Sequence, residues 1–142
     1  LCVVHTSTPS FASDVRVAQA MKDANPALKI GFVGAKVAVQ SEESLKKGPP
    51  IDFVARNEFD FTIKEVAEGR DLSAIDGLSW RAPDGGIVHN KDRAVLEDMD
   101  QLPFVTEVYK RDLRIEDYFI GYLLHPYVSL YTGRGCKSPC TV

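Results

Sequence analysis

The chain has 142 residues, of which 44% are hydrophobic and 26% are charged, and it carries a formal net charge of −3 at pH 7. This size and composition are ordinary for a soluble globular domain, and the weakly acidic balance argues against nucleic acid or an anionic membrane surface as a partner. Its longest apolar runs, residues 1–4 and 119–124, are too short to span a bilayer. Three cysteines, two of them close together, do not form the framework of a secreted disulfide-rich domain, so we expect a cytoplasmic protein.

The first half of the chain alternates strand-like and helix-like segments. Apolar runs at residues 1–5, 29–33 and 51–55 lack polar alternation, which is typical of strands buried on both faces of a parallel sheet. Helices are predicted over residues 13–25, 41–47 and 61–68, with Ser13 or Asp14 as the first N-cap and Gly69 as the last C-cap. This rhythm predicts right-handed βαβ units.

The loops that follow the three predicted strands are residues 6–10, 34–39 and 56–60. Ligands of open parallel sheets bind beyond the carboxyl ends of the strands, so these loops are expected to line one edge where a ligand would sit. Because the chain opens inside the first strand, with no initiator Met and no signal-peptide pattern, we expect it to be a piece of a longer polypeptide.

After Gly69 the pattern changes. Residues 78–81 and 86–89 flank Pro83-Asp84-Gly85, which predicts an antiparallel hairpin. Residues 95–114 show little periodicity and are expected to form an extended connector, and residues 127–131 are predicted as the last strand.

The chain ends in a Gly-Arg-Gly loop, residues 133–135, followed by Cys136 and Cys140. Two cysteines at this spacing can be unconnected surface thiols, a zinc or disulfide pair, or ligands of an iron–sulfur cluster, which requires thiolates. The arrangement resembles the start of the radical S-adenosylmethionine (SAM) cluster loop, Cys-x3-Cys-x2-Cys. Its third cysteine would fall on the residue after Val142, so the chain is expected to stop one residue short of a complete ligand set.

Taken together, the chain resembles radical SAM proteins that carry a cobalamin-binding domain, and its detail is most similar to the hopanoid-biosynthesis-associated branch. The stretches that carry this resemblance are residues 3–11, 33–36, 57–62, 75–81 with 100–103, and 133–140. The resemblance starts at the family's third strand, which implies that the first two βα units are missing.

The resemblance implies an α/β fold: part of a doubly wound, Rossmann- or flavodoxin-like parallel sheet, followed by a hairpin and a linker into the start of a radical SAM barrel. The implied parts are residues 1–72, the C-terminal part of the cobalamin-binding-like domain; residues 73–126, the hairpin and linker; and residues 127–142, the first barrel strand and the truncated cluster loop.

The implied activity is that of an enzyme that reductively cleaves S-adenosylmethionine and starts radical chemistry on a small or lipid-like substrate, such as a hopanoid. Cys136 and Cys140 would be two of the three ligands of a [4Fe–4S] cluster. The chain by itself is expected to be inactive and to bind none of these cofactors, because two thiolates are too few. Its catalytic residues are not identified.

Cobalamin is a second cofactor that the resemblance implies. The residues expected to contact it are Thr6, Ser7, Thr8, Ser10, Gly34 and Glu58. The four hydroxyls equally suit an ordinary helix-capping loop, and Glu58 suits a solvated helix N-terminus. At Ala35 and Phe59 the chain lacks the usual glycines, which permit close backbone approach, so whether cobalamin is bound stays open.

Two other functions remain open from the residues. The chain could be a non-enzymatic, flavodoxin-like module that binds a small ligand at the same edge, or a structural assembly domain whose edge is closed by side chains such as Lys36 and Phe59. Because the first two strands of the sheet are expected to be missing, the apolar run from Leu1 to His5 is expected to be an exposed sheet edge, which favours a homodimer or a domain-swapped arrangement through that strand.

Overall fold

A computed structural model describes residues 1–130 of the chain. The chain divides into two compact units, of which unit 1 is Leu1–Leu96 and unit 2 begins at Glu97. The predicted cluster ligands, Cys136 and Cys140, lie outside the described residues. None of the described helices is long and apolar enough to cross a membrane.

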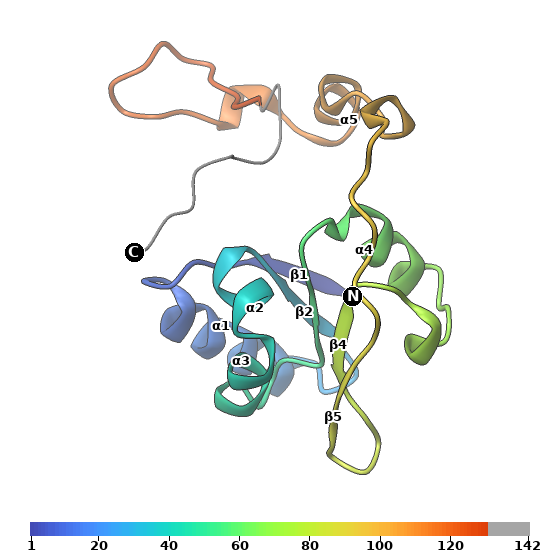
Figure 1. The fold of residues 1–142 in the computed structure, drawn as a ribbon. Helices are drawn as coiled ribbons and strands as arrows, with labels where there is room; N and C mark the ends of the chain where they lie inside the picture. The colour runs from blue at the N-terminus through green and yellow to red at the C-terminus, as the bar shows by residue number, and fades with distance from the viewer. Residues whose placement is uncertain (131–142) are drawn as a thin grey trace. The chain divides into compact units, whose positions relative to one another are not determined.

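Unit 1 is built on one five-stranded open sheet with the strand order β1-β2-β3-β4-β5 (Figure 1). Its strands are β1 (Cys2–His5), β2 (Ile30–Val33), β3 (Phe53–Ala55), β4 (Leu78–Arg81) and β5 (Ile87–His89). The first three strands are parallel, and β4 and β5 are antiparallel additions. The predicted α/β class and the parallel βαβ core are therefore confirmed.

The hairpin β4–β5 continues this sheet instead of following it as a separate element. Phe53 pairs with Trp80, Val54 with Ser79 and Ala55 with Leu78, so β4 is hydrogen-bonded along the whole of β3. A sheet edge with unpaired backbone groups is unfavourable, and the hairpin covers the edge that β3 would otherwise present. Strand β1 remains the opposite edge of the described sheet, as predicted.

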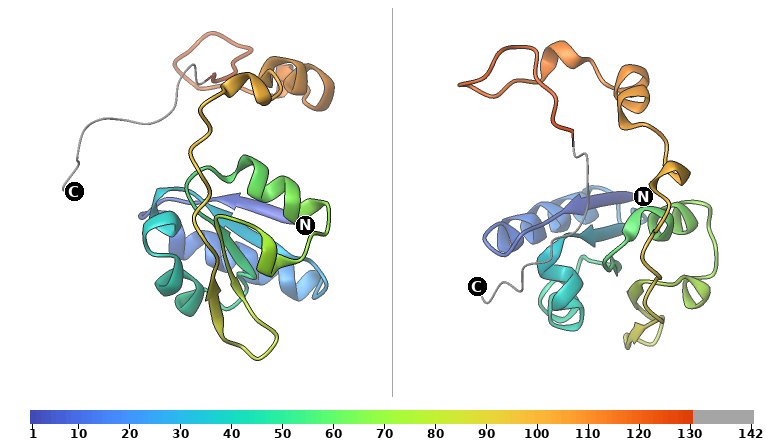
Figure 2. Two further views of the ribbon diagram at one scale, coloured as in Figure 1. Left: turned by 45° about the vertical axis from the view of Figure 1, so that its right-hand side comes forward. Right: turned by 45° about the horizontal axis from the view of Figure 1, so that its top comes forward.

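Helices cover both faces of the sheet (Figures 1 and 2). The helices are α1 (Phe11–Ala24), α2 (Ala35–Val39), α3 (Ser41–Lys47) and α4 (Phe59–Ala67), with a short 3-10 turn at Leu72–Ala74. The connections through α1 and through α2–α3 cross the same face, because each leads to the next parallel strand in the same direction. Helix α4 lies on the other face.

Two apolar clusters hold these layers together, one on each face. Ile30 and Phe32 of β2 pack with residues of α1, α2 and α3. On the other face Phe53 packs with Val66 of α4. The Phe53 ring lies directly over Gly31, where an added Cβ would overlap it. The alternation of adjacent strand residues between the two faces explains why these strands are apolar throughout.

Two details of unit 1 differ from the sequence prediction. Helix α1 begins at Phe11, with Ser10 as its N-cap residue, so the caps predicted at Ser13 or Asp14 are wrong. The Asp14 carboxylate instead accepts a hydrogen bond from the Thr6 hydroxyl, at 2.7 Å. The segment predicted as a loop at residues 34–39 contains α2, which is too short to show helical periodicity in the sequence.

Unit 2 contains a 3-10 turn at Met99–Gln101, α5 (Val105–Asp112) and a second 3-10 turn at Ile115–Asp117. The connector predicted as extended is therefore partly helical. Residues 127–130 are not in a strand, contrary to the prediction for residues 127–131. A single strand is unstable without a partner, and none of the described residues of unit 2 forms a strand with which it could pair. No residue between 97 and 130 is buried.

Candidate functional site

The carboxyl ends of the three parallel strands meet at one edge of the sheet. We call this edge the rim and define it as residues 6–10 after β1, residues 34–36 after β2 and residues 56–58 after β3. All six predicted cofactor contacts lie in these three loops. In open α/β sheets such an edge is where ligands bind, so its geometry decides what the site can hold.

The first rim loop is held by its own hydroxyl groups. Thr6 is 1% exposed and donates its hydroxyl hydrogen to Asp14 Oδ2 over 2.7 Å. The hydroxyls of Ser7 and Ser10 lie 2.9 Å apart, and the Ser7 backbone N–H donates to Ser10 Oγ over 3.0 Å. Thr8 is exposed. Three of the four predicted cofactor hydroxyls therefore bind within the loop that leads into α1.

The first and second rim loops are in direct contact at Gly34. The Thr6 N–H donates to the Val33 carbonyl over 2.9 Å. Gly34 has φ +118° and ψ 167°, and a Cβ at this position would collide with the Thr6 carbonyl oxygen. Only glycine satisfies both conditions. The structure thus gives Gly34 a role in loop packing, whatever its role toward a cofactor.

Side chains fill the corner between α1 and α2. The Lys36 ammonium lies 5.0 Å from the centroid of the Phe11 ring and donates to Gln40 Oε1 over 2.6 Å. Phe11 in turn packs edge-on against Phe32, with ring centroids 6.1 Å apart. Val37, two residues from the start of α2, is fully buried. Cation–π and aromatic contacts of this kind stabilise the corner as it stands.

The third rim loop begins α4. Asn57 adopts a left-handed conformation with φ +51°, and Glu58 occupies the N-cap position without a side-chain cap bond. Neither Glu58 nor Asp60 lacks an interaction partner. Carboxylates are favoured in the first turn of a helix by the helix dipole, which accounts for both residues without a ligand.

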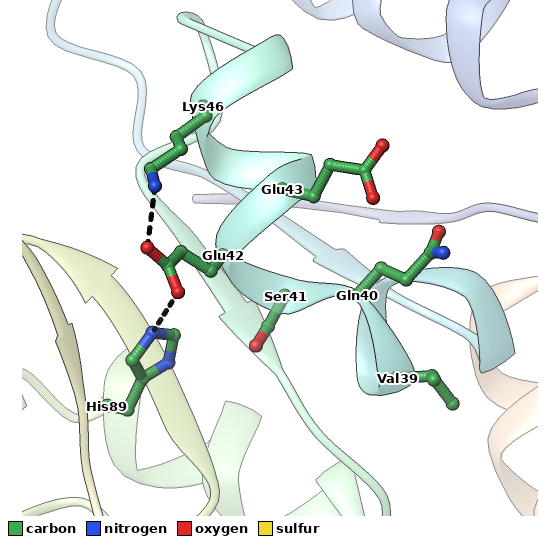
Figure 3. A pocket seen from close by; sticks show the side chains of 7 residues that line it. All are labelled: Val39, Gln40, Ser41, Glu42, Glu43, Lys46 and His89. Carbon is green, nitrogen blue, oxygen red and sulfur yellow. Dashed lines mark hydrogen bonds and ion pairs between the residues drawn. The ribbon is translucent and has the colours of Figure 1, made fainter.

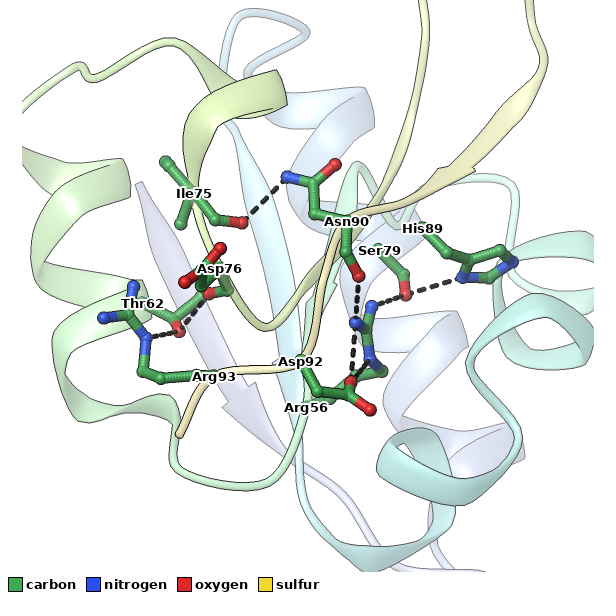
Figure 4. A network of polar contacts seen from close by, with 9 residues as sticks. All are labelled: Arg56, Thr62, Ile75, Asp76, Ser79, His89, Asn90, Asp92 and Arg93. Atoms are coloured by element: carbon green, nitrogen blue, oxygen red, sulfur yellow. Dashed lines mark hydrogen bonds and ion pairs between the residues drawn. The ribbon is translucent and has the colours of Figure 1, made fainter. Parts of the chain in front are cut away.

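A buried arginine that the sequence did not reveal organises the end of the sheet next to this loop (Figure 4). Arg56 is 8% exposed, and its Nη2 donates to Asp92 Oδ1 over 2.8 Å and to the Asn90 carbonyl over 2.6 Å. Its Nη1 donates to Ser79 Oγ. A buried guanidinium requires such partners. The only sequence signal was a positive charge directly after a buried strand.

A second arginine extends this network toward α4. Arg93 Nε donates to Thr62 Oγ1 over 2.8 Å (Figure 4). Arg93 Nη2 forms an ion pair with Glu65 Oε2 at 2.7 Å. Thr62 is fully buried and donates its hydroxyl hydrogen to the Asp76 carbonyl over 2.9 Å. Hydrogen bonds therefore hold residues 90–93, which follow β5, against the carboxyl end of β3 and the start of β4.

An open hollow of about 550 Å³ lies away from the rim contacts, between α3 and β5 (Figure 3). It is lined by Val39, Gln40, Ser41, Glu42, Glu43, Lys46 and His89. His89 Nδ1 is 2.8 Å from Ser79 Oγ, and its Nε2 is 3.9 Å from Glu42 Oε2. None of the six predicted cofactor contacts lines this hollow.

An ion pair between Glu42 and Lys46 lies in the hollow. The Lys46 ammonium, 2.6 Å from Glu42 Oε1, lowers the pKa of the Glu42 carboxyl from its ordinary value through its hydrogen bond and its charge, with a smaller contribution from His89. The carboxylate is therefore ionised at neutral pH. The described residues contain no group of three or more His, Cys, Asp or Glu side chains that could hold a metal ion.

The rim as packed does not fit cobalamin. A nucleotide tail entering at the carboxyl edge requires space between the first two loops and free donors for its phosphate. Gly34 instead lies against the Thr6 carbonyl, and Arg56 and the hydroxyls of Thr6, Ser7 and Ser10 bind groups of the chain itself. We therefore derive no chemical step through cobalamin.

Comparisons with known proteins identify relatives but no family model that matches the chain. Over 140 residues, 95% of the chain, it is 29% identical to an uncharacterized methyltransferase of Pyrococcus horikoshii. Over 102 residues, 67% of the chain, it is 28% identical to the anaerobic magnesium-protoporphyrin IX monomethyl ester cyclase of Rubrivivax gelatinosus. Its relatives are enzymes.

Among solved structures the chain resembles part of OxsB, a cobalamin-dependent S-adenosylmethionine radical enzyme determined with aqua-cobalamin and S-adenosylmethionine bound. The likeness covers 66% of the chain and 14% of OxsB, with a TM-score of 0.51 and 15% sequence identity. It supports the Rossmann-like open sheet. The chain spans 29% of the methyltransferase and 18% of the cyclase, so it corresponds to a fraction of each relative's length.

Proposed function

We propose that the chain is part of a radical SAM enzyme, with unit 1 as a cobalamin-binding-like domain and its last residues as the start of a cluster loop. The observation that carries the proposal is the spacing of Cys136 and Cys140 behind Gly133-Arg134-Gly135. The fold likeness to a SAM radical enzyme supports it, as does the match to a methyltransferase along nearly the whole chain.

In this proposal Cys136 and Cys140 act as thiolate ligands, and a third cysteine follows Val142. Together these three thiolates would hold a [4Fe–4S] cluster, which would supply the one-electron reductive cleavage of S-adenosylmethionine with an electron from an external low-potential reductant. The glycines on both sides of Arg134 would let the loop bring the thiolates together locally. Such thiolates require a reducing compartment, which supports a cytoplasmic location.

The substrate we propose is a small or lipid-like molecule, and the resemblance of the chain to the hopanoid-associated branch supports a hopanoid. The finding that no described helix could cross a membrane is compatible with a cytoplasmic enzyme. We also propose that the chain forms a homodimer through β1, because Leu1 is 51% and Val3 38% exposed at the sheet edge.

The test is anaerobic iron and sulfide quantification on the polypeptide extended past Val142. We expect about four irons per chain, lost in both Cys136→Ala and Cys140→Ala. Cys2→Ala is the matched control, because Cys2 lies in β1 and is free. Loss of this half-buried thiol should leave the iron content unchanged.

Absence of iron from the extended wild-type protein, in a sample that is folded by circular dichroism, would reject the enzyme proposal. The alternative would then be a non-enzymatic module that binds a small ligand or mediates assembly. The hollow between α3 and β5 is the observation that favours ligand binding, and the Lys36–Phe11 contact that closes the rim is the one that favours assembly.

A further inference from the structure

We propose that unit 1 has the fold of a cobalamin-binding domain but is closed to cobalamin by its own side chains, so that the protein does its radical chemistry without this cofactor. The inference rests on the proposed function, because it concerns which cofactors that enzyme carries. Of the six residues expected to contact cobalamin, Thr6, Ser7, Ser10 and Gly34 then serve the packing of the rim.

The first two rim loops are in direct contact at Thr6 and Gly34. The Thr6 N–H donates to the Val33 carbonyl over 2.9 Å, one position beyond the pairing of β1 with β2, and a Gly34 Cβ would collide with the Thr6 carbonyl oxygen. Because protein interiors are close-packed, a ligand that needs room at this point would have to displace one of the two loops.

Three of the four rim hydroxyls, those of Thr6, Ser7 and Ser10, are bound within the chain, whereas Thr8 is exposed. Thr6 is 1% exposed, and its hydroxyl hydrogen is donated to Asp14. The hydroxyls of Ser7 and Ser10 bind each other. A ligand that recruited any of these groups would have to replace an existing hydrogen bond, which removes the net gain of the new one.

The positive charge nearest the third loop is also committed. The Arg56 guanidinium donates to Asp92, to the Asn90 carbonyl and to Ser79, and only 8% of the residue is exposed. A phosphate at the rim would meet a guanidinium already neutralised by a carboxylate. Lys36, the other cation of this edge, lies over the Phe11 ring and binds Gln40.

The volume under the rim is filled by apolar side chains. Phe11 is 8% exposed and packs edge-on against the fully buried Phe32, and Val37 is fully buried beside them. In a domain with an empty apolar pocket at this place, the side chains at these three positions would line a cavity instead of filling it. The hollow between α3 and β5 is lined by other residues, and neither Phe11, Phe32 nor Val37 contributes to it.

The experiment uses the full-length polypeptide, extended at both ends so that the βα units expected before Leu1 are present, produced with hydroxocobalamin in excess, loaded anaerobically with iron and sulfide, and desalted. Cobalt and iron are measured in the same sample, and the unfolding midpoint is measured with and without added hydroxocobalamin. A ligand that binds the native state raises the midpoint. We expect cobalt to be lost on desalting, no shift of the midpoint and no change in the visible spectrum of cobalamin.

Each outcome bears on the inference separately from the proposed function. Iron without cobalt supports both. Iron together with one cobalt per chain, and a raised midpoint, overturns the inference and leaves the radical SAM proposal standing. Cobalt without iron overturns both. A folded protein with neither metal supports the closed rim and rejects the cluster.

The variant Thr6→Val separates a packing role from a cofactor role. It removes the hydrogen bond to Asp14 but keeps the shape of the side chain. A packing role predicts a lower unfolding midpoint with unchanged cobalt content. A drop in cobalt content relative to wild type would contradict the inference. Such a drop could occur only if the wild-type protein retained cobalt through Thr6.

Discussion

The contact between Gly34 and Thr6 makes a quantitative prediction about the stability of unit 1. Gly34→Ala places a methyl group on the Thr6 carbonyl oxygen and forces an L-residue to adopt φ +118°. The backbone conformation costs about 1–3 kcal/mol, and relieving the overlap costs about 1–3 kcal/mol more. The obstacle is a backbone atom held by the Thr6–Val33 hydrogen bond, so it cannot rotate away as a side chain would.

The expected loss, about 2–6 kcal/mol, is large against the total stability of about 5–15 kcal/mol for a domain. It is measured by urea denaturation of the chain followed by circular dichroism. Gly69→Ala is the matched control: Gly69 has φ +77°, but its added Cβ would meet no atom within 4 Å. That variant should lose about 1 kcal/mol, from conformation alone.

The difference between the two variants reports the steric contact together with the costlier backbone conformation at Gly34, which has φ +118° where Gly69 has φ +77°. If Gly34→Ala were no more destabilised than Gly69→Ala, the rim loops would not be in the contact described. The argument that the rim is closed would then lose its first step. A loss of slope in the urea transition would instead report a change in the denatured or native ensemble.

Three further predictions test other parts of the molecule. Arg56→Met is expected to lower the unfolding free energy by about 1–3 kcal/mol, since the Asn90 carbonyl loses its donor; an unchanged urea midpoint would contradict the network. Hydrogen bonds from the Ser73 backbone N–H and hydroxyl hold the pKa of Asp71 below its ordinary 3.8. Stability from Asp71 is therefore present above that pH and lost as pH falls toward the lower folded pKa, so the deficit of Asp71→Ala in urea denaturation should shrink below about pH 4. Val3→Lys on the β1 edge should convert a dimer to a monomer in sedimentation, whereas a wild-type chain that sediments only as a monomer would contradict the dimer.

Strands β2 and β3 were predictable because a strand that is buried on both faces is apolar along its whole length. Residues 30–33 and 53–55 are buried throughout, and an apolar run without polar alternation has few other solutions. The hairpin was predictable for a different reason. Gly85 takes φ +86° in the turn after Pro83-Asp84, and such turn residues identify themselves in the sequence.

What the sequence left open was how these elements meet. Nothing in the pattern around Arg56 indicates that its partners lie more than thirty positions later, at Asn90 and Asp92. Helix α2 was missed because its five residues span little more than one helical turn. The strand predicted at residues 127–131 had the right residue types, but strand formation depends on a neighbouring strand.

The rim shows why residue type alone cannot separate a cofactor loop from a capping loop. Thr and Ser hydroxyls suit both, because each role asks for a short side chain that exchanges hydrogen bonds with nearby polar groups. What distinguishes the two roles is whether the hydrogen-bond partner of the hydroxyl belongs to the same chain. At Thr6 that partner is Asp14, eight positions along, which the sequence had assigned to a helix cap. The Asp14 carboxylate, one turn inside α1, therefore binds the Thr6 hydroxyl and keeps it from a ligand. Although no cofactor motif singled out Asp14, it is the residue that most directly tests whether the rim is open to a ligand.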